Sequence, residues 1–288
     1  MAYGCTARPC IFLPPLATYS ADLRLYDEMK FRKNTSFAYM KGGLSMKKVT
    51  ALSITMALCA SLTTASFVTG PSSASAAPVK EWVKISEQTS YYGEVKNGVP
   101  NGRGTMLWGE HKQYSGDFID SKREGTGKYM NEYGSDGEKH TVVYIGAWKQ
   151  DNMNGKGTLT HKVTMEDSAV RSNEILMGAF TNGTLQTGYD VIHALADPDY
   201  SFTYKNSQET LSILGSNINM KSSLKKGNLF SVDYRNGSTV KSCSIFPAET
   251  KAKQRKNDAD LKYLQSISLK LNPYLEEFEK LSKQVPLK

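Results

Sequence analysis

The sequence lacks the local signatures of several large classes of protein. It has no run of twenty apolar residues free of polar interruptions, so nothing in it demands a membrane-spanning helix. It has no Gly-x-Ser-x-Gly elbow, P-loop or dinucleotide fingerprint. Its histidines (His111, His140, His161 and His193) show no spacing that closes a metal site. We therefore predict a protein that is not an enzyme, with no catalytic residue, cofactor or metal.

Cysteine is also scarce. Cys5, Cys10 and Cys59 lie in the first 76 residues, which leaves Cys243 alone in the rest of the chain. One cysteine cannot form an internal disulfide. We interpret Cys243, within the segment Val240–Ile245, as a small strand residue and not as a nucleophile.

The excess of positive charge is concentrated in the first 76 residues. The net charge is +8, but residues 1–76 hold eight of the 36 Lys and Arg residues and only three of the 28 acids, which leaves +3 for the remainder. A basic surface large enough for nucleic acid is therefore not indicated, and we predict no nucleic-acid partner.

Glycine and tyrosine are abundant, with 23 and 16 residues, and many of them recur in a fixed pattern. Three stretches share a spacing that begins with Tyr-x-Gly and ends with Gly-x-Gly, which indicates an internal repeat. The three copies are Tyr91, Gly93, Gly98, Gly102, Gly104; then Tyr114, Gly116, Ser121, Gly125, Gly127; then Tyr144, Gly146, Asp151, Gly155, Gly157.

Each copy predicts one β-hairpin. Apolar and aromatic residues alternate before a turn such as Asn97-Gly98, and a second short strand follows. The glycine two residues after each tyrosine leaves room for a ring, so the ring of one repeat is expected to lie over the backbone of the next. A lone hairpin is marginal in water, and the hairpins are therefore expected to stack into one elongated, single-layer β-meander.

The pattern resembles the MORN (membrane occupation and recognition nexus) repeat, whose unit begins Tyr-x-Gly-x-Trp-x-x-Gly and continues to Gly-x-Gly. The resemblance covers residues 91–189, with a degenerate fourth unit of Leu176, Gly178, Phe180 and Gly183. Inserts at 131–143 and 162–174 are expected to form loops at one edge of the array. The resemblance implies a role in protein interaction or scaffolding, with lipid head-group binding as a less secure suggestion.

Aromatic residues are the candidate binding residues. A single-layer sheet cannot cover both of its faces, so some rings are expected to be exposed in a groove, although the core of the sheet is the alternative reading for all of them. The candidates are Tyr92, Trp108, Phe118, Tyr129 and Trp148.

Acidic residues offer a different hypothesis. Glu94 and Asp117 occupy equivalent places in neighbouring repeats and could mimic the carboxylate pair of a glycan hydrolase, although Ala147 takes that place in the third repeat. Asp190, His193, Asp197 and Asp199 form the best cluster for a cation, but they read equally well as a loop.

The front of the chain has the features of an export signal. Met46-Lys47-Lys48 opens a basic segment, an apolar segment follows to Val68, and Ala74-Ser75-Ala76 fits a signal-peptidase site, so cleavage is expected between Ala76 and Ala77. Codons for Lys41-Gly42-Gly43 can contain a bacterial ribosome-binding sequence. Residues 1–45 are therefore expected to be a spurious upstream extension, disordered if translated, and the protein to be bacterial and secreted or held at the cell surface.

The second half continues as β-structure and then turns helical. Residues 190–248 predict further strands, among them Tyr200–Tyr204 and a hairpin about Asn236-Gly237. Residues 249–288 predict a helical segment interrupted at Asn272-Pro273. Its apolar stripe consists of Leu264, Ile267, Leu271, Tyr274, Phe278 and Leu281, which favours packing on the sheet over pairing with a second copy.

Together these features predict a mainly β protein: a signal peptide at 46–76, repeats at 77–189, further strands at 190–248 and a closing helical segment at 249–288. The leading hypothesis is an exported binding or scaffolding module that engages a protein or an anionic envelope polymer or glycan through its rings, with a homo-oligomer left open. One alternative is the Glu94/Asp117 hydrolase. Another is peripheral contact with anionic membranes through the basic stretch at 251–256.

Overall fold

The computed structural model describes residues 78–288. The expected upstream extension, the signal peptide and the Ala76/Ala77 cleavage site lie outside this range and stay predictions.

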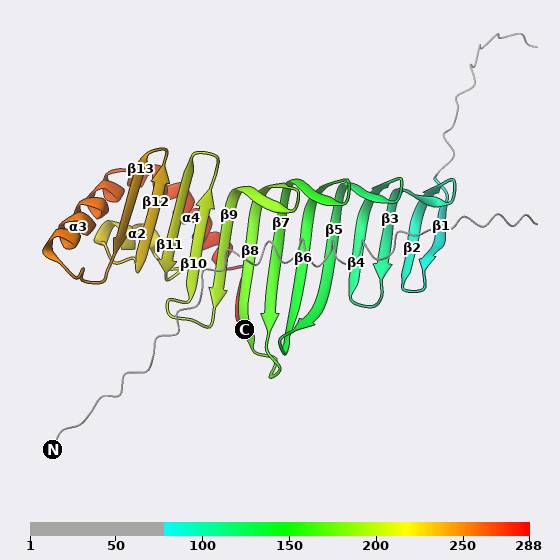
Figure 1. The fold of residues 1–288 in the computed structure, drawn as a ribbon, viewed down its shortest axis with the longest axis horizontal. Helices are drawn as coiled ribbons and strands as arrows, with labels where there is room; N and C mark the ends of the chain where they lie inside the picture. The colour runs from blue at the N-terminus through cyan, green and yellow to red at the C-terminus, as the bar shows by residue number, and fades with distance from the viewer. Residues whose placement is uncertain (1–77) are drawn as a thin grey trace, which may run out of the picture. The chain divides into compact units, whose positions relative to one another are not determined.

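The described residues form one antiparallel sheet whose strands follow each other in chain order (Figure 1). This arrangement confirms the predicted mainly β meander with added strands and C-terminal helices. The strands are β1 (Lys80–Ser86), β2 (Thr89–Lys96), β3 (Val99–Trp108), β4 (Lys112–Ile119), β5 (Lys122–Ser135), β6 (Glu138–Lys149), β7 (Asn152–Thr164), β8 (Val170–Thr181), β9 (Thr184–Ala194), β10 (Tyr200–Lys205), β11 (Glu209–Gly215), β12 (Ser231–Asn236) and β13 (Thr239–Ser244).

The repeat hairpins turn on pairs of residues with left-handed backbone, as the twist of a two-residue hairpin requires. Asn97 and Gly98 have φ of 53° and 77°, and the same geometry recurs in the second and third hairpins. The equivalent pairs are Asp120-Ser121 and Gln150-Asp151.

Each repeat bends toward one side of the sheet. Tyr114 and Phe118 lie four residues apart on β4, a spacing of about 13 Å in a straight strand, yet their ring centroids are 5.1 Å apart. A register shift at Gly116/Asp117 marks the bend. The side toward which the strands bend carries Tyr91, Tyr114 and Tyr144, and we call it the tyrosine face; the opposite side is the groove face.

Aromatic rings pack edge to face along the tyrosine face, at centroid distances of 5.1–5.3 Å. Each such pair contributes about 0.5–1.5 kcal/mol beyond the area it buries. The ladder runs through the buried rings of Tyr91, Phe118, Tyr114, Trp148, Tyr144 and Phe180. Phe180 belongs to the degenerate fourth hairpin, which therefore extends the array although Leu176 replaces its tyrosine.

The repeat glycines make room for these rings, but not across repeats as expected. The Tyr91 ring lies over Gly104 of its own hairpin, since a Cβ at Gly104 would come within 2.4 Å of the ring. Tyr91 Oη then donates a hydrogen bond of 2.7 Å to the Glu94 carbonyl. The expectation that a ring covers the next repeat is therefore wrong, because the bend folds each hairpin onto its own tyrosine.

The two inserts are mostly strand, with short turns at 136–137 and 165–169, so the expectation that they form loops is wrong. Their residues lengthen β5, β6, β7 and β8, which are among the longest strands in Figure 1. Alternation explains the result: Val142 and Val163 are buried on the tyrosine face while their neighbours in sequence lie on the other side.

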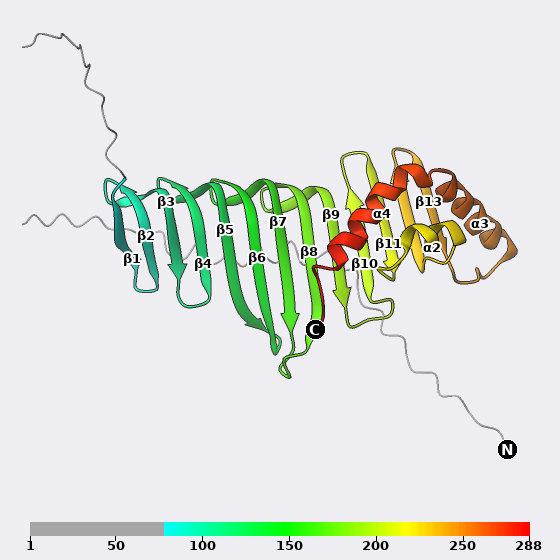
Figure 2. The same cartoon turned by 180° about the vertical axis from the view of Figure 1, so that it is seen from behind.

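The buried face changes partway along the sheet. In β8–β13 the groove face, not the tyrosine face, is covered, by α2 (Met220–Lys226), α3 (Lys251–Ser266) and α4 (Ser268–Ser282) (Figure 2). The core there includes Ile175, Val191, Phe202, Leu211, Ile213, Val232, Leu271, Leu275 and Phe278. The predicted apolar stripe is thus buried against the chain's own sheet, and Cys243 is a buried strand residue, as predicted.

Two buried carboxylates hold the helices on the sheet. Asp260 of α3 accepts hydrogen bonds from Lys241 and Lys256, and Glu209 of β11 pairs with Lys270 of α4 at 2.7 Å. Burial alone raises the pKa of each carboxyl, but the ammonium partners outweigh burial and hold both pKa values below their ordinary range.

Two further sequence expectations are wrong in detail. Residues 220–226 form the helix α2, within the range 190–248 where only further strands were expected. The C-terminal helices separate at Ile267, and Pro273 lies within α4. The break at Ile267 lets α3 pack on β13 while α4 crosses the sheet, a tertiary requirement that the position of proline does not report.

Candidate functional site

The groove face of the repeats carries a groove of about 660 Å³ that is lined by residues of β1–β6. No described element covers this part of the sheet (Figure 2). Its floor includes the backbone of the paired repeat glycines Gly93/Gly104 and Gly116/Gly127, whose Cβ positions point to the Tyr91 and Tyr114 rings on the other side of the sheet.

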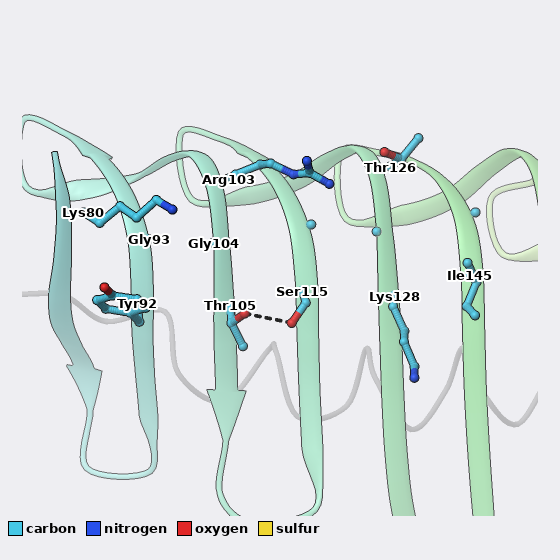
Figure 3. A pocket seen from close by; sticks show the side chains of 13 residues that line it. Lys80, Tyr92, Gly93, Arg103, Gly104, Thr105, Ser115, Thr126, Lys128 and Ile145 are labelled. Atoms are coloured by element: carbon cyan, nitrogen blue, oxygen red, sulfur yellow. Dashed lines mark hydrogen bonds between the residues drawn. The ribbon is translucent and has the colours of Figure 1, made fainter. Parts of the chain in front are cut away.

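The side chains that line the groove are cationic, hydroxylic or apolar (Figure 3). Lys80, Arg103 and Lys128 supply three positive charges, and no carboxylate belongs to the lining. Hydroxyls come from Thr105 and Ser115, which share a hydrogen bond of 2.8 Å, and from Thr126. Tyr92 and Ile145 are 44% and 56% exposed. The groove therefore suits an extended ligand that is partly apolar and partly anionic.

The five predicted binding rings lie in different environments. Phe118, Tyr129 and Trp148 are buried on the tyrosine face, where they serve as core. Trp108 is half-buried, with the Lys112 ammonium 5.5 Å from its ring centroid. Tyr92 alone of the five lines the groove, and the more exposed Trp82 lies 5.0 Å from it, ring to ring. A binding role stays a prediction for all five. Tyr92 is the strongest candidate, because its ring is exposed whereas three of the others are buried.

The equivalent acids Glu94 and Asp117 lie against the bend of their own hairpins. A Cβ at Gly102 would meet Glu94, and one at Gly125 would meet Asp117. Asp117 Oδ2 accepts a hydrogen bond of 2.9 Å from the Thr126 backbone N–H, which gives this carboxylate a structural role.

The predicted cation cluster is not assembled. Asp190 and His193 lie on opposite faces of β9, and His193 Nδ1 is 2.9 Å from the Val285 carbonyl. Of the four candidates, His193 and Asp199 do approach each other, with His193 Nε2 3.8 Å from Asp199 Oδ2. Within residues 78–288, no group of three or more His, Cys, Asp or Glu side chains is placed to hold a metal ion.

A buried histidine pair was not predicted from the sequence. His140 and His161 are 21 residues apart and are neighbours only because β6 and β7 pair along their extended ends. His140 Nδ1 and His161 Nε2 are 3.0 Å apart, Tyr133 stacks on the His140 ring, and Glu174 lies 3.7 Å from His161 Nδ1. Burial first, and the neighbouring His161 second, lower the pKa of His140, against the opposite effect of nearby acids.

This pair predicts acid sensitivity. Because the folded state lowers the His140 pKa, its contribution to stability is complete above the unfolded value of about 6.5 and is lost as the pH falls below it. Buried Asp190, whose pKa is raised, acts in the opposite direction. We therefore compare wild type with His140→Phe by urea unfolding between pH 7.5 and 5. The variant should lose less stability on acidification, and parallel curves would contradict this assignment.

The basic stretch that was proposed for membrane contact begins α3. Lys253 pairs with Glu249, and Lys256 with the buried Asp260, so two of its cations already have partners. Among residues 78–288, no helix is both long and apolar enough to cross a bilayer.

Hairpins stacked in chain order, each with a tyrosine lying over paired glycines, define this chain as a β-hairpin repeat protein. The MORN repeat family model matches residues 91–111, 114–130 and 144–162, which are the three predicted units. The chain therefore contains three MORN repeats.

Similarity to curated proteins is confined to the repeats. The chain is 38% identical over 69 residues to MORN repeat-containing protein 3 of Xenopus laevis, which is 24% of this chain and 29% of that protein. It is 30% identical over 95 residues to human alsin, 33% of this chain and 5% of alsin. The chain thus spans less than a third of the length of these relatives. MORN repeats suggest a protein- or membrane-binding scaffold.

Proposed function

We propose that this protein is a non-enzymatic, exported binding module that engages a protein partner through the groove face of its repeats. The groove itself is the observation that supports this role. It is lined by cations and hydroxyls from the six strands β1–β6, and it has no covering element among residues 78–288. The proposal places binding on this face because most of the predicted rings are buried on the tyrosine face.

Export is the part of the proposal that rests on sequence alone. The basic, apolar and small-residue segments at 46–76 are its support, and their order is that of a signal peptide. Cell fractionation followed by N-terminal sequencing tests it. A cell-surface or secreted protein that begins at Ala77 is expected, and full-length protein retained in the cytoplasm would refute it.

Affinity capture tests the binding role. Wild-type protein, Lys128→Glu and Lys149→Glu are immobilised and exposed to the same cell-envelope extract; both lysines are exposed, but only Lys128 lines the groove. We expect a protein that wild type and Lys149→Glu retain and that Lys128→Glu loses at least tenfold, because the substitution places an acid among the groove cations. Equal capture by all three, or none by any, contradicts the proposal.

A further inference from the structure

The register of the sheet defines two cross-strand rows of side chains on the groove face. The first row, which we call row one, is Ser90, Leu107, Gln113, Met130, Val143, Thr160, Ile175, Val191, Phe202, Ile213, Val232 and Cys243. Row two, one pleat away, contains Tyr92, Thr105, Ser115, Lys128, Ile145, Thr158, Met177, Tyr189, Tyr204, Leu211 and Tyr234. Both rows run from the repeats into the C-terminal half without interruption.

Helix α4 lies along both rows in the C-terminal half. Its Phe278 ring packs on Phe202 of row one at 5.3 Å and on Tyr189 of row two at 5.7 Å. Its Tyr274 ring stacks on Tyr204 of row two at 4.1 Å. The helix therefore crosses the strands from β12 toward β8, in the direction of the repeats (Figure 2).

The same rows continue uncovered beyond β8. Leu107, Met130 and Val143 of row one are only half-buried, although Ile175 and the following members of that row are buried. From β2 to β7 the open part crosses six strands, about 24 Å at the usual strand spacing, which a helix of about 16 residues covers. The length of α4 is 15 residues.

Charge distinguishes the open part from the covered part. Lys128 belongs to row two, Lys80 and Arg103 line the groove beside it, and no carboxylate belongs to the groove lining. Arg103 has an acid within reach, but its Nε is 3.7 Å from Asp117 and its side chain stays 77% exposed. A helix placed there would therefore be favoured by acidic residues on the side that faces the groove.

From this continuity and this charge we infer that the open rows bind an amphipathic helix of a partner protein, about four turns long, with an apolar stripe over Val143, Met130 and Leu107 and acidic residues toward Lys128 and Arg103. The partner helix would continue the line of α4 along the sheet, in the helix-in-groove mode of recognition. This inference rests on the proposed binding function and adds the class of partner.

A peptide with the sequence of residues 268–286 of this chain is the probe, because α4 already fits these two rows and carries Glu276, Glu277 and Glu279. Its fluorescence anisotropy is titrated with the full protein. A second peptide has lysine at those three positions. We expect saturable binding of the native-sequence peptide, whose three glutamates are balanced by Lys270, Lys280 and Lys283. We expect at least tenfold weaker binding of the lysine peptide, and weakening of the native-sequence complex by salt.

Variants then locate the site. Val143→Glu and Lys128→Glu should each weaken binding of the native-sequence peptide at least tenfold, whereas Val240→Glu, on the exposed tyrosine face of β13, should change this binding less than twofold. Because Lys128 is exposed, its substitution carries little folding risk. No saturable binding, or equal binding by all three variants, overturns the inference; the latter result would mean that the peptide exchanges with α4.

Other occupants give different results. If light scattering shows a dimer that Val143→Glu abolishes, a second copy occupies the rows and the inference falls. If the peptide does not bind but Lys128→Glu abolishes sedimentation with phosphatidylglycerol vesicles, the ligand is a lipid surface, and the inference again falls. If the peptide fails while groove-dependent protein capture succeeds, the proposed function stands and only the helical partner is rejected.

Discussion

Replacing Gly127 by alanine should strongly destabilise the repeat array. A Cβ at Gly127 would lie 2.4 Å from the Tyr114 ring, which cannot move aside because Phe118 and Trp148 pack edge to face on it. The ring must therefore leave its site, with loss of both aromatic contacts, and the expected cost is about 3–5 kcal/mol. Urea unfolding followed by circular dichroism measures it.

Gly134→Ala is the matched control. Gly134 lies in the same strand, β5, with ordinary backbone dihedrals, and the nearest atom to an added Cβ is 3.9 Å away. Removing glycine's excess backbone freedom should leave the stability unchanged or raise it by up to about 1 kcal/mol. If both substitutions cost the same, the ring-over-glycine packing is not what holds the repeat together.

The repeat itself was predictable because its determinants are local. Tyr114, Gly116 and Gly127 belong to one hairpin, and the turn residues between them need left-handed backbone that sequence reveals. Spacing therefore gave the strands, their order and the single sheet. It gave the hairpin at Asn236-Gly237 for the same reason.

The change of buried face was not predictable in this way. Alternation shows that one side of a strand is apolar but not which side of the sheet it is, so Tyr144 and Phe202 read alike although they lie on opposite faces. The bend that buries Phe118 and Trp148 likewise depends on register shifts that no short motif encodes. For this reason the groove, formed from glycine backbone and the residues between the motif positions, was missed, apart from Tyr92.

The contact between the second and third repeats contains a buried cation, Arg123, whose counter-charge is the Asp151 carboxylate. Removing this carboxylate should cause the second large loss of folding stability. The Arg123 guanidinium lies 4.3 Å from the Trp148 ring centroid, and its side chain is only 9% exposed. Asp151 supplies a carboxylate 3.1 Å from Arg123 Nε, and that carboxylate also accepts from the Arg123 backbone N–H at 2.9 Å. In the contact between the first and second repeats, the position of Arg123 is taken by Pro100, which leaves a backbone hydrogen bond from Ser121 to Pro100.

Asp151→Ala leaves the guanidinium buried without its counter-charge, and we expect a loss of about 3 kcal/mol, within the range for one partner removed from a buried pair. The control is Asp120→Ala. Asp120 also has left-handed backbone, with φ of 45° against 67° for Asp151. Its side chain, however, is exposed and accepts a hydrogen bond from the Asn101 amide instead of pairing with a buried cation. Both variants share the cost of alanine in that conformation, so their difference, about 2 kcal/mol, isolates the ion pair.

Arg123→Met decides whether charge or packing dominates at this contact between repeats. Methionine retains apolar volume among the rings, and the Asp151 carboxylate, 30% exposed, can recover hydration once the cation is gone. Arg123→Met should therefore cost less than Asp151→Ala in the same urea titration. The reverse order would show that the guanidinium contributes mainly through its contacts with Trp148 and the neighbouring rings, and that the ion pair adds little to the contact between the repeats.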